Sequence, residues 1–136
     1  MVTKILTDEK IKAGEAFLRI ADASNIKIEA ALWFYFQDQE IWKLMLSFKN
    51  IEIVGPKSIY NKLQKILSKI KNEHLIFLDE IVLLKPKDPL LALLKTVMRV
   101  SSDITGIRFT GNVIGGQLIP DTYIYRLRST KLKGPE

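Results

Sequence analysis

The chain has 136 residues, of which 47% are hydrophobic, a size and composition typical of one globular domain with its own core. It contains no cysteine and one histidine, His74, which excludes disulfides, thiolate metal sites and mechanisms that need two imidazoles. The net charge of +6 is uneven, since residues 1–54 carry seven Lys or Arg against eight Asp or Glu, and residues 55–136 carry fourteen against seven. An excess of positive charge in one half is compatible with an anionic partner.

No segment of the sequence is expected to enter a membrane. The first residues lack the basic-then-apolar layout of a signal peptide. The apolar runs 30–36 and 75–78 are far shorter than the roughly 20 residues that a membrane helix requires. We therefore expect a soluble, cytoplasmic protein without a membrane partner.

The first element is expected to be a helix that begins after Thr7 and ends near Ser24. Thr7 suits the N-cap position, and Asp8 and Glu9 lie in the first turn, where the helix dipole favours negative charge. Apolar residues over 11–21 recur close to helical spacing on one side. This pattern predicts an amphipathic helix that packs on the rest of the domain.

The aromatic-rich segment 28–48 predicts a β-hairpin that turns at the polar residues 37–40. If Phe36 faces Ile41, both faces of the hairpin are apolar. One face shows Ala31, Trp33, Tyr35, Trp42, Leu44 and Leu46, and the other shows Ala30, Leu32, Phe34, Phe36, Ile41 and Met45. A sheet with one wet face alternates between apolar and polar residues, so this hairpin is expected to be covered on both sides. The cover is either helices of the same chain or a second copy of it.

Two further helices, a strand and a second hairpin follow. Pro56 suits the start of a helix whose apolar stripe runs to Ile70, and a strand is expected over roughly 75–84. Asp88 and Pro89 are an N-cap and a first helical residue, and they open a helix that runs to about 100. The segment 107–127 reads as a hairpin around Gly115-Gly116, since paired glycines supply the positive φ of a tight turn.

The order α-β-β-α-β-α-β-β predicts an α+β domain, because its strands come in hairpins and not as regular βαβ units. We expect an antiparallel or mixed sheet of about five strands packed with three helices. One domain is expected over residues 1–128, followed by a flexible basic tail over residues 129–136.

The second hairpin holds the first candidate interaction surface. A two-residue turn pairs Arg108 with Tyr123. It places on one face the set Arg108, Thr110, Asn112, Gln117, Asp121, Tyr123 and Tyr125. The opposite face, with Ile107, Phe109, Val113, Leu118 and Ile124, is expected to pack on the core. Arg, Asn and Tyr are typical of recognition surfaces, although a solvated outer face is the alternative. A three-residue loop in place of the two-residue turn would exchange the two faces, and Pro120 invites a bulge.

The second helix carries a candidate anion-binding face. Lys62, Lys65 and Lys69 lie together on a helical wheel, beside the apolar stripe, and the helix contains no acidic residue. This arrangement suits contact with a nucleic acid backbone. The helix has no Arg and no turn that resembles a helix-turn-helix, so a solvated lysine face is the alternative.

No catalytic, metal-binding or cofactor-binding residues are identified, and no cofactor is expected. Whether the chain is an enzyme stays open, although the pattern favours a non-enzymatic role. We expect a protein-interaction module that self-associates, as a dimer, or binds a protein partner through its hairpin surfaces. One alternative is a nucleic-acid-binding accessory protein that uses the basic helix and Arg108. A third is a small enzyme with a site around Arg108, Asp121 and Tyr123.

Overall fold

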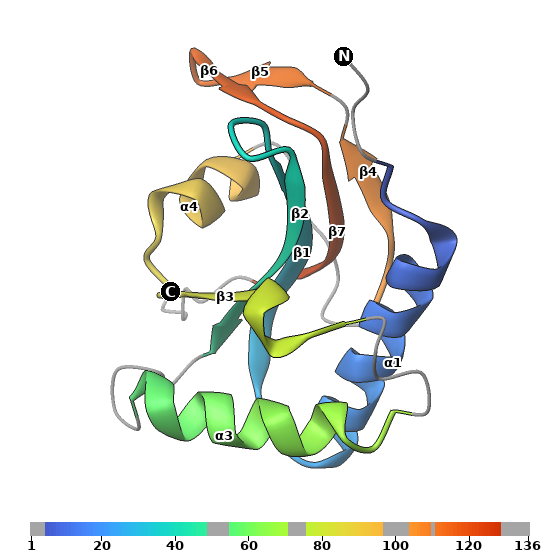
Figure 1. Cartoon of the computed structure of the whole chain (residues 1–136). Coiled ribbons are helices and arrows are strands. Elements are labelled where there is room, and N and C mark those ends of the chain that lie inside the picture. Colours follow the sequence, from blue (N-terminus) through green and yellow to red (C-terminus); the bar gives the residue numbers. More distant parts are fainter. Residues whose placement is uncertain (1–4, 49–54, 71–75, 97–103, 110, 129–136) are drawn as a thin grey trace.

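A computed structural model describes residues 5–48, 55–70, 76–96, 104–109 and 111–128 of the chain. Its helices are α1 (Asp8–Ala23), α3 (Pro56–Leu67) and α4 (Pro89–Lys95), with the 3-10 helix η2 (Leu78–Glu80). Its strands are β1 (Ile28–Phe36), β2 (Ile41–Phe48), β3 (Ile81–Leu84), β4 (Ile107–Phe109), β5 (Asn112–Ile114), β6 (Gln117–Ile119) and β7 (Thr122–Leu127) (Figure 1). The expected basic tail lies outside the described residues, as do residues 97–100 of the last expected helix. That helix, α4, ends earlier than predicted, at Lys95, with Thr96 as its C-cap.

Five strands form one mixed sheet in the order β3-β2-β1-β7-β4, and β5 and β6 form a separate two-stranded sheet. Strand β3 runs parallel to β2, whereas the other neighbours are antiparallel. This architecture confirms the predicted α+β class with three helices and a central sheet of five strands. Within the described ranges, no helix is long and apolar enough to cross a membrane.

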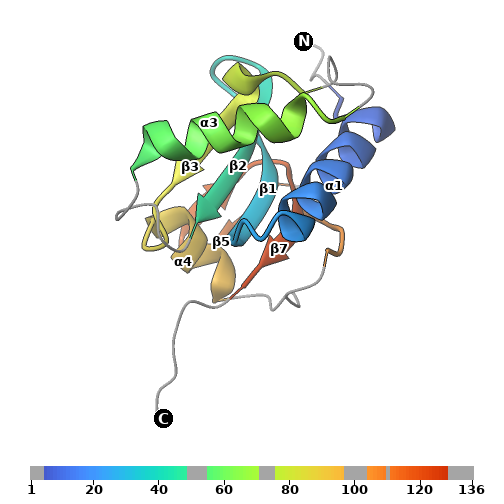
Figure 2. The ribbon, with the colours of Figure 1, turned by 90° about the horizontal axis from the view of Figure 1, so that it is seen from below.

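The first hairpin has the predicted register, with Trp33 opposite Leu44 and Phe36 opposite Ile41. The face that contains Trp33 packs against α1 and α3. The face that contains Leu32 and Met45 packs against α4 and the β5–β6 sheet. Figure 2 shows α1 and α3 on one side of the sheet and α4 on the other. The chain therefore covers both apolar faces of the hairpin with its own elements.

A buried hydrogen-bond relay joins the sheet to α1. The indole Nε1 of Trp33 donates to the hydroxyl of Tyr125 over 2.9 Å, and that hydroxyl donates to the carbonyl of Ile11 over 2.5 Å. Gly14 makes this approach possible, because a Cβ at that position would overlap the Tyr125 hydroxyl. The relay satisfies two polar groups inside the core and sets how closely α1 lies on the sheet.

The strand expected over 75–84 is shorter than predicted. Of the described residues 76–84, Ile81–Leu84 alone form a strand, and residues 78–80 form the 3-10 turn η2. The Glu80 side chain explains the turn, since it accepts a hydrogen bond of 2.7 Å from the backbone N–H of Phe77 and also pairs with Lys10. A side chain that satisfies the backbone locally competes with the strand ladder.

The second hairpin keeps its predicted register but not its predicted faces. Gly115 and Gly116 both have positive φ, and Ile114 pairs with Gln117 across them. The prediction that Val113 and Leu118 pack on the core was wrong, because these side chains are 67% and 56% exposed. The buried residues of this small sheet are instead Ile114 and Ile119, which pack against α4.

The buried face of the second hairpin changes because of the residues that separate the β4–β7 pair from the β5–β6 pair. Gly111 has a φ of 56°, which few residues other than glycine adopt readily. Pro120 stands opposite it and has no N–H to donate to a ladder. The two halves of the hairpin therefore form separate sheets, and the face that turns toward the core changes between them.

Replacing Tyr125 with Phe is expected to lower the free energy of unfolding by about 1–3 kcal/mol, because the buried Trp33 N–H loses its acceptor. Urea unfolding measures the change. Tyr60→Phe is the matched control, since its hydroxyl is only partly buried and its bond to Ile81 is 3.3 Å long. Equal effects of the two substitutions would contradict a special role for the relay.

Candidate functional site

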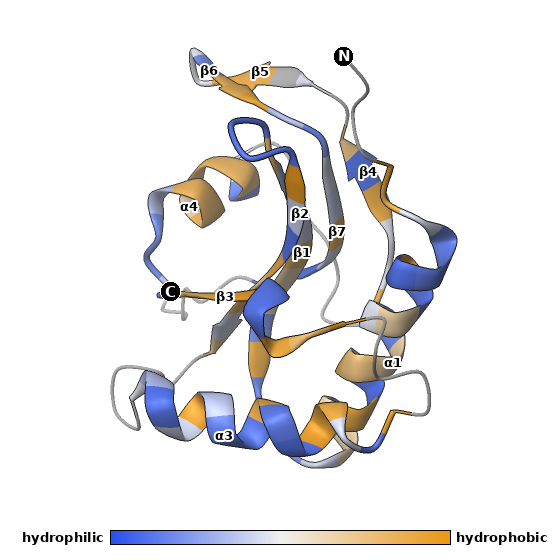
Figure 3. Ribbon diagram, in the orientation of Figure 1, coloured by the Kyte–Doolittle hydropathy of each residue, from blue (hydrophilic) through white to orange (hydrophobic). Residues whose placement is uncertain are grey.

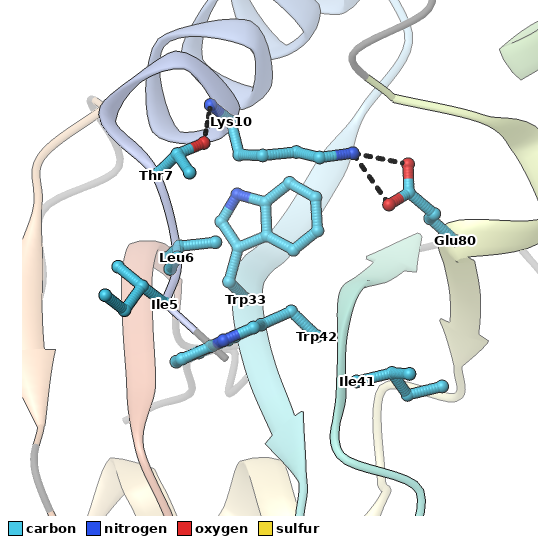
Figure 4. A pocket seen from close by; sticks show the side chains of 8 residues that line it. All are labelled: Ile5, Leu6, Thr7, Lys10, Trp33, Ile41, Trp42 and Glu80. Atoms are coloured by element: carbon cyan, nitrogen blue, oxygen red, sulfur yellow. Dashed lines mark hydrogen bonds and ion pairs between the residues drawn. The ribbon is translucent and has the colours of Figure 1, made fainter. Parts of the chain in front are cut away.

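An apolar cleft of about 260 Å³ opens where the turn end of the first hairpin meets the start of α1. We call it the aromatic cleft. It is lined by Ile5, Leu6, Thr7, Lys10, Trp33, Ile41, Trp42 and Glu80 (Figure 4). Trp33 forms its buried floor, and Trp42 lies next to it, half-buried. The lining is mostly apolar with one charged pair, the composition typical of recognition pockets.

An ion pair crosses one side of the aromatic cleft. Lys10 Nζ lies 2.9 and 2.7 Å from the two carboxylate oxygens of Glu80. The same ammonium lies 6.0 Å from the centre of the Trp33 ring and 5.9 Å from that of Phe77, within the range of cation–π attraction. Both members of the pair are partly exposed, so the pair presents polar groups beside an apolar floor.

Trp42 is held by its neighbours on the sheet. Its ring centre lies 5.3 Å from that of Tyr35, and the guanidinium of Arg108 lies 5.6 Å from it. These contacts fix the indole in the cleft wall while leaving it partly exposed. A large, fixed and partly exposed aromatic surface is typical of the anchors of protein interfaces.

Four large apolar side chains are exposed within the described residues, and they fall into two groups. Ile5, 79% exposed, lines the aromatic cleft, and Phe77, 54% exposed, lies beside its Lys10. Val113 and Leu118 face each other across β5 and β6. We call this second group the hairpin pair. In Figure 3 the β5–β6 sheet projects at one end of the molecule with hydrophobic residues on it.

The candidate surface on the second hairpin is only partly open. Arg108 pairs with Tyr123 as predicted, and Tyr123 and Tyr125 share a face, with ring centres 5.3 Å apart. Arg108 is exposed and Tyr123 is half-buried, but Tyr125 is 1% exposed and lies in the core under α1. Helix α1 thus covers the Tyr125 end of this face and leaves the Arg108 end open.

The remaining predicted residues are spread over different surroundings. Gln117 is exposed near the turn, and Asp121 is half-buried at the start of β7. The backbone carbonyl of Asp121 accepts from the N–H of Tyr35. Thr110 and the side chain of Asn112 lie outside the described residues. The aromatic cleft is not lined by Arg108, Asp121 or Tyr123.

The three predicted lysines form one basic surface on and just after α3. Lys62, Lys65 and Lys69 are all exposed, while Leu63, Ile66 and Ile70 beside them are buried. None of the ion pairs found among the described residues involves these lysines. The same described ranges hold no group of three or more His, Asp or Glu side chains placed to bind a metal ion.

Sequence reasoning missed the aromatic cleft as a site. Two of its residues, Trp33 and Trp42, were assigned to one hairpin face, which was a usable signal. Ile5, Lys10 and Glu80 gave no such signal, because they come from separate segments that meet only in the fold. Comparison with protein-family models, with curated proteins and with solved structures finds no match for this chain.

Burial raises the pKa of Tyr125 well above its ordinary value of about 10. The folded state therefore keeps Tyr125 protonated at pH values where the unfolded chain releases the proton. The stability linked to Tyr125 is intact below about pH 10, the unfolded pKa, and is lost as the pH rises toward the folded pKa.

The free energy of unfolding of the wild type is expected to decrease above pH 10 by up to about 1.4 kcal/mol per pH unit more than that of Tyr125→Phe. Urea unfolding of both proteins from about pH 9 to pH 11 checks this. The two proteins differ only in the Tyr125 hydroxyl, so the difference between their pH profiles isolates that group. Parallel pH profiles would contradict the raised pKa.

Proposed function

We propose that this protein is a non-enzymatic interaction module whose partner is a second copy of the same chain. In this dimer the hairpin pair of each copy occupies the aromatic cleft of the other. The observation that carries the proposal is that one chain presents both an open apolar cleft and an exposed apolar pair on a hairpin. Such reciprocal contact is the geometry of a two-fold symmetric dimer.

The size of the aromatic cleft supports a side chain as its occupant. Its volume of about 260 Å³ is below the roughly 300–1,000 Å³ of sites for drug-sized ligands. Trp42 offers a partly exposed flat apolar surface above the buried Trp33, and the ion pair of Lys10 and Glu80 provides a polar rim. An apolar centre with a polar rim is the usual arrangement of a protein interface.

The hairpin pair supports the same conclusion from the other side of the contact. Val113 and Leu118 are a cross-strand pair on the side of β5–β6 that faces away from the core. The buried residues Ile114 and Ile119 anchor this small sheet on α4. The exposed pair is thus held on a supported hairpin, and association would remove it from water.

Sedimentation velocity at increasing protein concentration is expected to show a monomer–dimer equilibrium. Ile5→Glu in the cleft and Leu118→Glu in the hairpin pair should each raise the dissociation constant by roughly 30-fold or more, as for loss of about 2 kcal/mol at an interface centre. Both positions are highly exposed, so folding should be retained. Gln64→Glu on exposed α3 surface is the control of equal charge change.

Mixing the two variants gives a sharper test. A heterodimer of Ile5→Glu with Leu118→Glu regains one complete contact, since one copy supplies an intact cleft and the other an intact hairpin pair. The mixture should therefore associate more tightly than either variant alone. A wild type that stays monomeric at high concentration, or a mixture no tighter than its components, would contradict the proposal.

A second candidate function is nucleic acid binding through α3. The observation that favours it is the exposed basic surface of Lys62, Lys65 and Lys69. Arg108, which the sequence grouped with these lysines, lies on the edge strand β4 against Trp42, and Figure 1 shows β4 and α3 at different ends of the molecule. The candidate surface is therefore the lysine face alone.

Binding to a double-stranded DNA fragment is expected to weaken with salt, and neutralising all three lysines as Lys62→Gln, Lys65→Gln and Lys69→Gln should reduce the slope of log K against log salt by about 3. Fluorescence anisotropy over a salt series measures the slope. The matched control replaces the exposed lysines Lys12, Lys85 and Lys87 with Gln, none of which lies on α3 or lines a cavity. An equal loss of slope in the control would indicate general charge attraction.

A further inference from the structure

A second cavity, of about 220 Å³, lies at the end of α1, where the chain turns into β1. It is lined by Asp22, Asn25, Ile26, Lys27, Ile28, Arg126 and Arg128. Its lining contrasts with that of the aromatic cleft, because three cationic side chains face one carboxylate. We call it the arginine pocket. The arginine pocket contains no candidate site residue predicted from the sequence, and it takes no part in the proposed dimer.

Arg126 is the most buried charge of the arginine pocket, with 3% of its side chain exposed. Its Nη1 and Nη2 donate to the two carboxylate oxygens of Asp22 over 3.0 and 2.7 Å, and Nη1 also donates to the carbonyl of Ile28 over 3.1 Å. The Nε–H is buried and has no acceptor among the described residues. A buried guanidinium donor without a partner is rare and indicates a missing acceptor.

The paired carboxylate does not neutralise the arginine pocket. Asp22 is 42% exposed and offers one negative charge, which Arg126 already uses. Glu29, outside the lining, lies 3.6 Å from the guanidinium of Arg128. Lys27 is exposed at the same place, so the lining keeps an excess of positive charge.

The end of α1 does not compete for these cations. The carbonyls of Ile20, Ala21 and Asp22 accept hydrogen bonds from the backbone N–H groups of residues 24–26. Asn25 adopts a φ of 61° to allow this turn. The helix carbonyls are thus satisfied locally, and the negative end of the helix dipole is partly screened from the pocket.

A purely structural role accounts for part of this arrangement. The bidentate contact of Arg126 with Asp22 ties α1 to β7, and the bond to Ile28 ties it to β1. That role uses Nη1 and Nη2 only. It leaves the Nε–H, the charge of Lys27 and the hollow beside them without an explanation.

We propose that the arginine pocket binds a phosphate group, with Arg126, Arg128 and Lys27 as its cationic ligands. A phosphate offers several strong acceptor oxygens, and guanidinium groups recognise such oxygens through directed, charge-assisted hydrogen bonds. The group would provide the acceptor that the Arg126 Nε–H lacks, while Asp22 holds the guanidinium in place. The site is independent of the proposed dimer, because no residue of the two contacts is shared.

Titration of the full chain with inorganic phosphate, followed by NMR, tests the proposal. The side-chain Nε–H signal of Arg126 is expected to shift and saturate with a dissociation constant on the order of 1 mM or tighter. Sodium chloride at matched ionic strength is the reference. A shift that matches the chloride series would overturn the proposal.

Two substitutions test the site without breaking the contact of Arg126 with Asp22. Arg128→Gln should weaken phosphate binding by about tenfold and Lys27→Gln by about threefold, as one charged partner is lost in each case. Lys87→Gln is the matched control and should leave binding unchanged, because Lys87 is exposed between β3 and α4 and lines neither cavity. Binding that neither pocket variant weakens would place the phosphate elsewhere and overturn the proposal.

Two further probes define the chemistry of the group. Glycerol 3-phosphate binding at least as tightly as inorganic phosphate would support a phosphate carried by a larger ligand. Weaker binding of this ester than of inorganic phosphate would support the free ion as the ligand. Acetate binding as tightly as phosphate would overturn the assignment to phosphate, since a carboxylate would then suffice.

Discussion

The contact between the sheet and α1 depends on one buried relay, in which the Trp33 indole donates to the Tyr125 hydroxyl and that hydroxyl donates to the carbonyl of Ile11. The three residues come from β1, β7 and α1, so the relay joins three elements at one point. Each polar group in it would be costly to bury alone, and together they are satisfied. Gly14 admits the hydroxyl because it has no Cβ. The relay therefore fixes the position of α1, and with it the walls of both cavities.

The aromatic cleft is a consequence of that position. Residues 5–7 precede α1, so the relay that sets the helix also brings Ile5 and Leu6 over Trp33 and Trp42. Glu80, in η2, completes the rim because it pairs with Lys10, which lies in the first turn of α1. The cleft remains open since α1 and α3 cover the centre of the hairpin face and leave its turn end partly bare. In the proposed dimer, this partly bare end of the hairpin is the surface that each copy offers to the other.

The arginine pocket lies at the other end of α1 and has the opposite character. There the chain turns from helix to β1, and Arg126 joins the two through Asp22 and the carbonyl of Ile28. One end of the helix thus borders an apolar cleft and the other a cationic pocket. A rigid helix between the two keeps their chemistry apart, which is why the self-association and phosphate proposals can be tested separately.

The sequence by itself determined where the helices begin and how residues pair within each hairpin. Both turns are local signals, the polar residues 37–40 and Gly115-Gly116, and a turn of known length sets every pair that follows from it. Only the tertiary structure decided which faces are covered. Tyr125 is buried because α1 packs over it, and Gly14, distant in the sequence, leaves room for its hydroxyl. Val113 is exposed because the hairpin changes face at Gly111. Residue patterns record neighbours along a strand, whereas burial depends on elements that meet only after folding.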